Sequence, residues 1–264
     1  MSELRFEGVT VRYGNRRRGV TAVDGVDLVV PVGMIVGLVG ESGSGKSTLA
    51  RAAVGLTPLT GGRILLGERP LPPVRAGRRP LQMVFQDPYS SLDPRMTVGT
   101  SIAEAMPRQS VQGGAARRAE VARLLELVDL APDRADRYPE QLSGGQRQRV
   151  ALARALAAAP DVIIADEITS ALDVSIQGTV LNLVRDLQRQ MNLSMLFISH
   201  NLAVVRYVSD VIAVMYAGRI VEVGPADDVL LEPQHPYTRE LLAAAPQPLE
   251  PDRGEVGDTT PAHR

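Results

Sequence analysis

The sequence predicts an α/β fold whose core is a mostly parallel β-sheet. Short apolar segments of strand length alternate along the 264 residues with segments of helical periodicity, a pattern typical of a parallel sheet covered by helices on both faces. Apolar residues make up 44% of the chain, enough for a core of one or two domains. A helical stretch from about residue 88 to 157 interrupts the alternation. Because it is too long for a loop, we expect an inserted helical subdomain.

The first third of the chain is predicted to be rich in strands. Residues 4–13 carry apolar side chains in strand-like alternation, and a second strand is expected after the arginine run Arg16–Arg18. That run fits a solvated loop, or else a contact with a nucleotide or an anionic surface. A Pro/Arg-rich segment at 70–80 is expected to be irregular. In order, we expect strands at 4–13, 20–30, 34–39, 63–66 and 81–85, and a helix at 49–54.

Helices and strands then alternate along the remainder of the chain. Helical periodicity extends from Val98 to about Leu130 and ends before Pro132. Two short helical pieces are expected after Pro225, and the tail from Pro246 is expected to be disordered. The other predicted elements are helices at 144–158, 175–190 and 202–208, and strands at 161–167, 194–199, 211–216 and 219–223.

Composition excludes several classes of protein. The formal net charge is −1, which argues against a nucleic-acid-binding surface as the main function. The chain contains no cysteine, so it has no disulfide framework, thiolate zinc site or iron–sulfur cluster. Its N-terminus lacks the layout of a signal peptide, and no apolar run reaches the roughly 18 residues of a membrane span. We therefore expect a cytoplasmic chain that is soluble by itself.

A nine-residue segment between a predicted strand and a predicted helix carries the clearest chemical signal. It fits the phosphate-binding pattern G-x-x-x-x-G-K-[ST]. Its glycines permit a tight turn whose backbone N–H groups point at phosphate, and the helix N-terminus adds partial positive charge. We expect Lys46 to reach the β- and γ-phosphates of a nucleotide and Ser47 to ligate Mg²⁺. The predicted phosphate-binding residues are Gly40, Glu41, Ser42, Gly43, Ser44, Gly45, Lys46, Ser47 and Thr48.

The use of lysine supports this assignment. Of the 29 Lys and Arg residues, Lys46 is the only lysine. A compact ammonium fits a phosphate cradle in which the planar guanidinium of arginine would not. A single accidental lysine is the alternative, but it would have to fall by chance inside this motif.

Polar side chains at the ends of other predicted strands belong with this loop. Asp166 can hold Mg²⁺, and the adjacent Glu167 can polarise an attacking water. His200 can donate to the γ-phosphate, and Gln86 can reach the metal or the water. Each is predicted to be strand-final in one parallel sheet, so these side chains are expected to converge at one edge. Taken alone, a strand-final histidine is more often a packed or surface residue, and an Asp-Glu pair is more often a helix cap. The combination with the phosphate loop favours nucleotide hydrolysis.

The segment Leu142-Ser143-Gly144-Gly145-Gln146 resembles the signature of ATP-binding-cassette (ABC) ATPases. The other motifs of that family match in order over residues 4–245. The resemblance implies an ABC ATPase fold with an N-terminal antiparallel β portion. It also implies roles for the matching residues. Tyr13 stacks on adenine, Gly40–Thr48 is the Walker A motif and Gln86 is the glutamine of the Q-loop. Val162–Asp166 is the Walker B motif, Glu167 is the catalytic glutamate, Ser170–Asp173 is the D-loop, which ends in Asp173, and His200 is the switch histidine.

The signature segment also suggests a dimer. Ser143, Gly144, Gly145 and Gln146 open a helix, so they form a second anion-binding helix N-terminus. One monomer cannot easily apply two such sites to one ATP. In the family the second site is supplied by another subunit, so two cassettes enclose two ATP molecules with Mg²⁺. Whether the partner is a second copy or a different subunit stays open.

Within the family the chain resembles the oligopeptide and dipeptide importer branch, through the segments 85–95, 138–143 and 235–242. The resemblance implies a subunit that hydrolyses ATP to energise a membrane importer, peripheral on the cytoplasmic face of the membrane. Its implied partners are two permease subunits and an extracytoplasmic solute-binding protein, with no nucleic acid. The branch also includes nickel and glutathione importers, so the solute stays open. We assign 1–232 to the ATP-binding domain and 233–264 to a short C-terminal extension with a disordered tail.

Two alternatives remain. A soluble ABC ATPase acting on nucleic acid or ribosomes would be expected to carry a long coiled-coil insertion or a second cassette, and this sequence has neither. A degenerate, non-hydrolysing cassette is the other alternative, because Ile168 stands where branch members usually have proline. Isoleucine lacks the fixed φ of proline, so a looser loop around Glu167 is expected. We nevertheless expect an active enzyme in which Ile168→Pro changes turnover by less than about tenfold.

Overall fold

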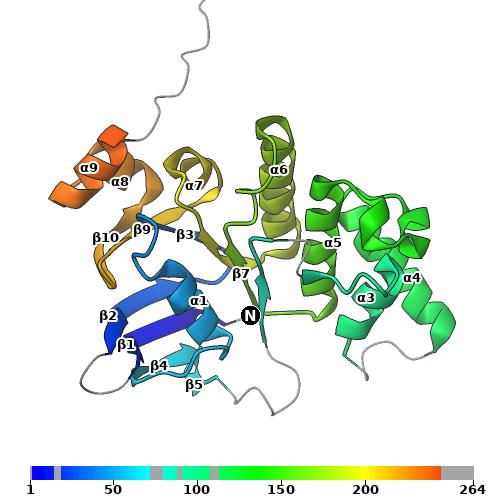
Figure 1. Cartoon of the computed structure of the whole chain (residues 1–264), viewed down its shortest axis with the longest axis horizontal. Coiled ribbons are helices and arrows are strands. Elements are labelled where there is room, and N and C mark those ends of the chain that lie inside the picture. The colour runs from blue at the N-terminus through cyan, green and yellow to red at the C-terminus, as the bar shows by residue number, and fades with distance from the viewer. Residues whose placement is uncertain (1, 15–18, 72–79, 88–90, 108–112, 245–264) are drawn as a thin grey trace, which may run out of the picture.

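The computed structural model describes residues 2–14, 19–71, 80–87, 91–107 and 113–244. The expectations for Arg16–Arg18, for residues 72–79 of the Pro/Arg-rich segment and for the tail after residue 245 lie outside these ranges. The larger of two β-sheets runs through the middle of the molecule, the smaller lies beside it, and a group of helices forms one end (Figure 1). The α/β class predicted from the sequence is confirmed.

The first sheet is antiparallel and lies on the N-terminal side. Its strand order is β2-β1-β4-β5, with β1 (Leu4–Tyr13) between β2 (Val20–Val30) and β4 (Gly61–Leu66), and β5 (Arg69–Pro70) at the edge. The bounds of β1 and β2 are those predicted, β1 from its alternating apolar side chains. This sheet is the antiparallel β portion that the family resemblance implied.

The second sheet positions the predicted site. Its order is β10-β9-β3-β8-β7-β6; the five strands from β9 to β6 are parallel, and β10 pairs antiparallel with β9. Every residue of β3, β7 and β8 is buried, which explains why these strands are unbroken apolar runs. The strands are β3 (Ile35–Val39), β6 (Leu81–Val84), β7 (Val162–Asp166), β8 (Ser194–Ile198), β9 (Val211–Tyr216) and β10 (Arg219–Pro225).

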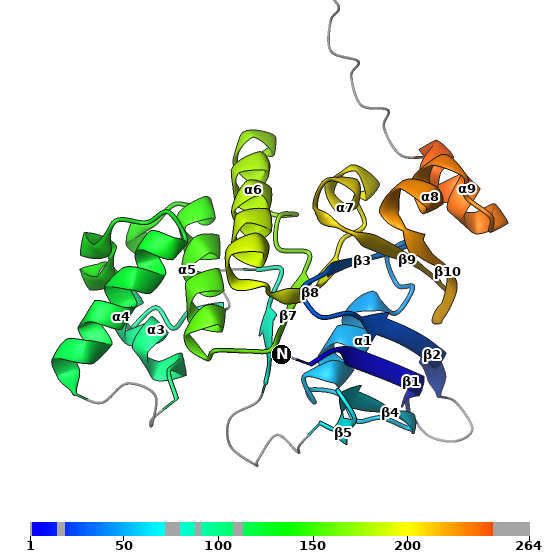
Figure 2. The same cartoon turned by 180° about the vertical axis from the view of Figure 1, so that it is seen from behind.

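Two apolar clusters cover the two faces of this parallel sheet. Along β3, Val36 and Leu38 join the cluster shared with the antiparallel sheet and α1 (Lys46–Ala53). Ile35 and Val39 point the other way, into the cluster formed with the remaining helices. The sheet is therefore a central layer between the antiparallel sheet and the later helices (Figures 1 and 2).

The helices between β6 and β7 lie together at one end of the molecule (Figure 2). The expected single helical stretch from 98 to 130 is corrected: α3 ends at Ala105 and α4 begins at Gly114. Pro107 explains the end of α3, because Met106 before it adopts an extended conformation. The elements are α3 (Val98–Ala105), α4 (Gly114–Leu127), the 3₁₀ helices η1 (Pro132–Asp136) and η2 (Pro139–Gln141), and α5 (Gly144–Ala157).

After β7, α6 packs between α5 and α7, α7 packs on β3, and α8 packs on the β9–β10 hairpin. The β9–β10 hairpin turns at Ala217 and Gly218, both at positive φ as a tight hairpin requires, and this turn was predicted. Of the helices in the described ranges, none combines the length and apolar character needed to cross a membrane. The helices are α6 (Val174–Met191), α7 (Leu202–Val208), α8 (Ala226–Leu231) and α9 (Pro236–Ala244).

Candidate functional site

The glycine-rich loop joins β3 to α1 at the carboxyl edge of the parallel sheet. Gly40 and Gly45 both lie at positive φ, 152° and 108°. A Cβ on Gly40 would lie 2.1 Å from the carbonyl oxygen of Met215, and one on Gly45 would lie 2.3 Å from that of Ala22. Only glycine fits at these two positions, so the backbone can close into the tight turn that a phosphate cradle needs.

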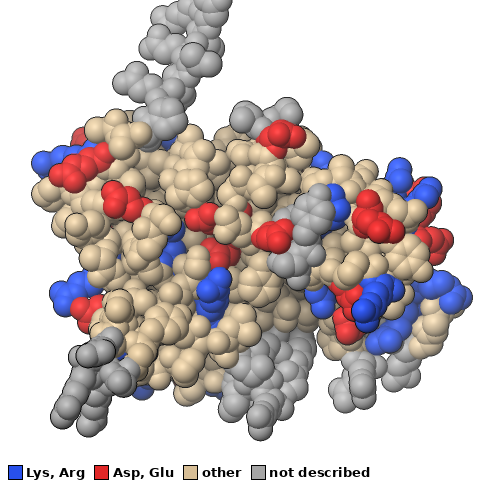
Figure 3. All heavy atoms as spheres, in the orientation of Figure 1, with Lys and Arg blue, Asp and Glu red and all other residues tan. Residues whose placement is uncertain are grey.

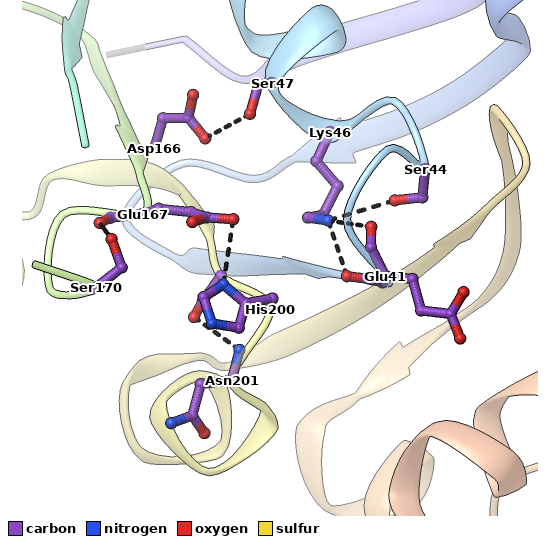
Figure 4. A network of polar contacts seen from close by, with 11 residues as sticks. Glu41, Ser44, Lys46, Ser47, Asp166, Glu167, Ser170, His200 and Asn201 are labelled. Atoms are coloured by element: carbon purple, nitrogen blue, oxygen red, sulfur yellow. Dashed lines mark hydrogen bonds and ion pairs between the residues drawn. The ribbon is translucent and has the colours of Figure 1, made fainter. Parts of the chain in front are cut away.

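Lys46 lies inside this turn. Its side chain is 4% exposed, and Nζ donates to the carbonyl oxygens of Gly40 (2.8 Å) and Glu41 (2.7 Å) and to Ser44 Oγ (3.3 Å) (Figure 4). Burial lowers the pKa of Lys46, a shift that nearby carboxylates partly oppose. The ammonium is thus held by neutral oxygens of its own loop, where an anionic phosphate would bind it more strongly.

Ser47 and Asp166 meet beside the loop. Ser47 Oγ donates to Asp166 Oδ1 at 3.1 Å, and the Asp166 side chain is buried at the end of β7. Burial raises the pKa of Asp166, and the hydrogen bond from Ser47 acts in the opposite direction. A hydroxyl and a carboxylate are hard oxygen donors of the kind Mg²⁺ prefers. Within the described ranges no group of three His, Cys, Asp or Glu could hold a metal, so a Mg²⁺ ion here would also need ligands of other kinds, such as phosphate or water oxygens.

Glu167 follows Asp166 in an unusual backbone conformation. Its φ is +50°, in the left-handed region that side-chain-bearing residues rarely adopt. Its N–H donates to the carbonyl of Ile198 at 2.9 Å, and its own carbonyl accepts from the backbone and hydroxyl of Ser170 at 3.1 and 2.9 Å. These bonds hold a strained residue in place, which is typical of functional sites.

The Glu167 carboxylate faces His200. Glu167 Oε1 lies 3.3 Å from His200 Nδ1 (Figure 4). The side chain of Glu167 is 17% exposed and that of His200 is 56% exposed, so the histidine lies on the open side of the pair. A carboxylate in contact with an imidazole and close to a phosphate loop can accept a proton from water while the histidine holds it in position.

The remaining predicted residues lie around this centre. Gln86 and His200 were predicted to be strand-final and are not. Strand β6, at the edge of the sheet, ends at Val84, two residues before Gln86. Strand β8 ends at Ile198, and His200 lies in the turn from Ser199 to Asn201 that leads to α7. Gln86 is exposed, and the described bonds do not join it to the loop. Tyr13 ends β1 beside the loop, where a hydrogen bond with Thr48 lowers its pKa.

The signature segment has a separate position. Ser143 and Gln146 form a reciprocal cap on α5: Ser143 Oγ accepts from the Gln146 N–H at 3.3 Å, and Gln146 Oε1 accepts from the Ser143 N–H at 3.0 Å. Gly144 and Gly145 form the first turn of α5, which belongs to the helical group away from α1 (Figure 1). Asp173 lies exposed at the start of α6. These residues are not brought into the centre formed by Lys46.

Ile168 is part of the core. Its side chain is 1% exposed and belongs to the apolar cluster beneath the helices. The residue that replaces proline therefore anchors the loop after Glu167 by packing, a contribution that its position in the sequence does not reveal. The burial of Ile168 indicates that the loop after Glu167 is fixed by packing, which argues against the looser loop expected without proline.

Shortening Ile168 is expected to destabilise the fold. We expect Ile168→Ala to cost about 2–5 kcal/mol of unfolding free energy, because it leaves a cavity in a packed core. Val20 is 69% exposed, so Val20→Ala is the control and should change stability by less than about 0.5 kcal/mol. Urea unfolding measures both variants. Equal midpoints would show that Ile168 does not anchor the loop.

One residue in contact with the loop was not predicted. The hydroxyl of Tyr237, in α9, accepts a hydrogen bond from the backbone N–H of Glu41 at 2.9 Å. Residues 235–242 were identified from the sequence only as a mark of the importer branch. The two residues are 196 positions apart, so no local pattern could have paired them.

Comparison with known proteins is consistent with this geometry. A model described as "ABC transporter" matches residues 23–170, and one described as "Oligopeptide/dipeptide transporter, C-terminal region" matches residues 221–263. A candidate peptide import ATP-binding protein of Brucella ovis is 46% identical over 254 residues, covering 94% of this chain and 80% of the relative. Glutathione import ATP-binding protein GsiA of Escherichia coli K12 is 52% identical over 262 residues, covering 95% of this chain and 42% of the relative.

Solved structures have the same architecture. CbiO1 of Clostridium perfringens, part of the transporter complex CbiONQ, superposes with a TM-score of 0.76 at 27% identity, covering 87% of this chain and 90% of that one. The cassette MJ0796, solved as a dimer in a post-hydrolysis state bound to ADP and phosphate, superposes with a TM-score of 0.72 at 27% identity, covering 84% and 98%.

Proposed function

Because the chain belongs to the ABC transporter family of ATPases, we propose that it hydrolyses ATP to energise a membrane importer for oligopeptides, dipeptides or related small solutes. The observation that carries the proposal is the pairing of a cassette with the oligopeptide/dipeptide C-terminal region in one chain. The Brucella ovis relative supports peptides as the solute, and GsiA makes glutathione the second candidate.

In this proposal the residues around the loop divide the work of hydrolysis. The backbone of Gly40–Thr48 binds phosphate oxygens, and Lys46 exchanges its carbonyl partners for the β- and γ-phosphates. Ser47 and Asp166 hold Mg²⁺, which when bound neutralises phosphate charge. Glu167 accepts a proton from the attacking water, and His200 orients the carboxylate from 3.3 Å away.

The capped N-terminus of α5 acts in a partner subunit. Ser143, Gly144 and Gly145 present backbone N–H groups that an anion can bind, and they lie apart from the Lys46 centre of their own chain. A second cassette facing the first would apply this segment to the ATP held by Lys46. The dimeric MJ0796 structure supports such a pairing between cassettes.

A permease would dock on the helical group. A hollow of about 400 Å³ opens between β6, α3 and α5 and is lined by Phe85, Glu104, Ala105 and Arg154, among others. Phe85, which lines the hollow, is the residue before Gln86, so a helix seated there would contact the chain next to Gln86. We place the chain on the cytoplasmic face of the membrane, with two permease subunits and an extracytoplasmic solute-binding protein as partners.

Purification of the intact assembly tests this function. Affinity-tagged chain extracted from membranes in mild detergent should retain permease subunits, and mass spectrometry of the complex should identify a bound peptide or related solute. An ATPase acting on ribosomes or DNA would instead retain those. Arg and acidic side chains are interspersed on the face shown in Figure 3, which favours the first outcome. Recovery of ribosomes or nucleic acid without permease would overturn the proposal.

Filling the hollow should uncouple the chain from its permease. Glu104 lines it and forms an exposed 3.4 Å ion pair with Arg154, which contributes little to stability. We expect Glu104→Trp to lose permease in co-purification while ATP binding by the isolated chain is unchanged. The control is Glu126→Trp, the same substitution at an exposed site on neighbouring α4. Equal permease recovery from both variants would place the docking surface elsewhere.

A further inference from the structure

The C-terminal extension is fixed to the sheet by one carboxylate. Glu222, on β10, accepts hydrogen bonds from the backbone N–H groups of Gln234 (2.8 Å) and His235 (3.0 Å) and from the hydroxyl of Thr238. Burial alone would raise the pKa of Glu222, but these bonds outweigh it and the pKa is lowered. An ionised Glu222 thus holds the start of α9 on β10.

This attachment places a tyrosine against the phosphate loop. Tyr237 is 6% exposed, and its ring packs on Tyr216 of β9 with centroids 4.2 Å apart. Its hydroxyl oxygen lies 2.9 Å from the backbone nitrogen of Glu41 and accepts that N–H. Burial raises the pKa of Tyr237, so the hydroxyl stays neutral at physiological pH.

The bond from Tyr237 completes the support of one peptide group. The peptide unit between Gly40 and Glu41 donates its N–H to Tyr237 and accepts the Lys46 ammonium on its C=O at 2.8 Å. The two groups of a trans peptide point in opposite directions and rotate together. Tyr237 and Lys46 therefore hold this unit from opposite sides. Loss of the bond to Tyr237 lets this unit rotate and changes the direction of the carbonyl that Lys46 contacts, while the bonds from Nζ to Glu41 and Ser44 remain.

We propose that Tyr237 is a positioning residue of the nucleotide site. Its hydroxyl fixes the peptide between Gly40 and Glu41, and through that peptide it fixes the ammonium of Lys46. The extension is then part of the support of the phosphate loop. This inference rests on the proposed phosphate-binding role of the loop, so its test begins with ATP binding by the unaltered chain.

Tyr237→Phe keeps the ring on Tyr216 and removes only the acceptor. We expect the Kd and KM for ATP to rise about 3- to 10-fold, since a partly buried N–H loses its protein partner. The kcat at saturating ATP should change less than about twofold, because bound phosphate itself orders the loop. The control is Tyr207→Phe, which removes a hydroxyl bonded to Asn182 between α7 and α6.

The single lysine of the chain offers a direct readout. Uniform ¹³C-lysine labelling of the full chain, with a lysine-free tag, gives one side-chain Cε–Hε signal. Tyr237→Phe should shift that signal in the absence of ATP, and Tyr207→Phe should leave it in place. A role in packing alone would lower the unfolding midpoint without moving the lysine signal or the Kd.

A second variant tests whether the extension acts through its attachment. Glu222→Gln keeps the size of the side chain and weakens the bonds that hold α9, so it should shift the lysine signal and Kd in the same direction as Tyr237→Phe. If the unaltered chain fails to bind ATP, the proposed function is wrong. If it binds ATP and both variants keep its Kd and its lysine signal, the inference about Tyr237 is overturned.

Discussion

Lys46→Ala is expected to abolish productive ATP binding. Lys46 is almost fully buried, and its ammonium is hydrogen-bonded to carbonyl oxygens of the phosphate loop. Alanine therefore removes the positive charge that a phosphate would meet there. Hydrogen bonds to charged groups contribute about 1.5–3 kcal/mol each, so we expect binding to weaken on the order of 100-fold. Titration of the isolated chain with a fluorescent ATP analogue measures the loss.

Lys46→Arg should fail as well. Three oxygen atoms lie within 3.3 Å of Nζ, and the larger, forked guanidinium cannot take the place of a point charge among them. The control is Arg63→Ala, which removes an exposed cation paired with Glu7 on the antiparallel sheet and should leave ATP binding unchanged. Turnover near that of the unaltered chain in the arginine variant would contradict the proposed role of Lys46.

The parts of the fold that depend on local pattern were predictable from the sequence. Alternating apolar residues predicted β1 with its observed bounds, and the glycine pattern located the loop before α1. Burial on both faces makes β7 an apolar run, so its last residue, Asp166, could be placed at the sheet edge. In each case neighbouring residues determine the structure, and no distant contact has to be known.

The parts that depend on distant contacts were not predictable. Gln86 was expected at a strand end, but β6 is an edge strand and stops two residues earlier. The left-handed conformation of Glu167 is held by a hydrogen bond to Ile198 on β8, a residue that the sequence does not place beside it. Tyr237 meets Glu41 where Glu222 and the packing on Tyr216 hold α9 against the sheet. Such contacts arise from tertiary packing, which outweighs local preference.

Glu167→Gln is expected to bind ATP and hydrolyse it slowly. Glutamine keeps the shape of the side chain and the backbone bonds to Ile198 and Ser170, so the loop should stay in place. It cannot accept a proton from water, and general bases contribute about 10²- to 10⁴-fold to rate. We therefore expect turnover to fall by that factor, with ATP affinity close to that of the unaltered chain.

The slow variant should also accumulate as a dimer, because ATP between two cassettes is not consumed. Gel filtration with ATP and Mg²⁺ would show the dimer for Glu167→Gln and a monomer without nucleotide; Glu126→Gln, on the exposed surface of α4, is the control. A monomer under both conditions would contradict the proposed pairing.

Suppose instead that the unaltered chain hydrolysed ATP as slowly as Glu167→Gln and that Ile168→Pro restored turnover. Burial of Ile168 would then hold Glu167 in an inactive position, and the fault would lie in the loop after β7.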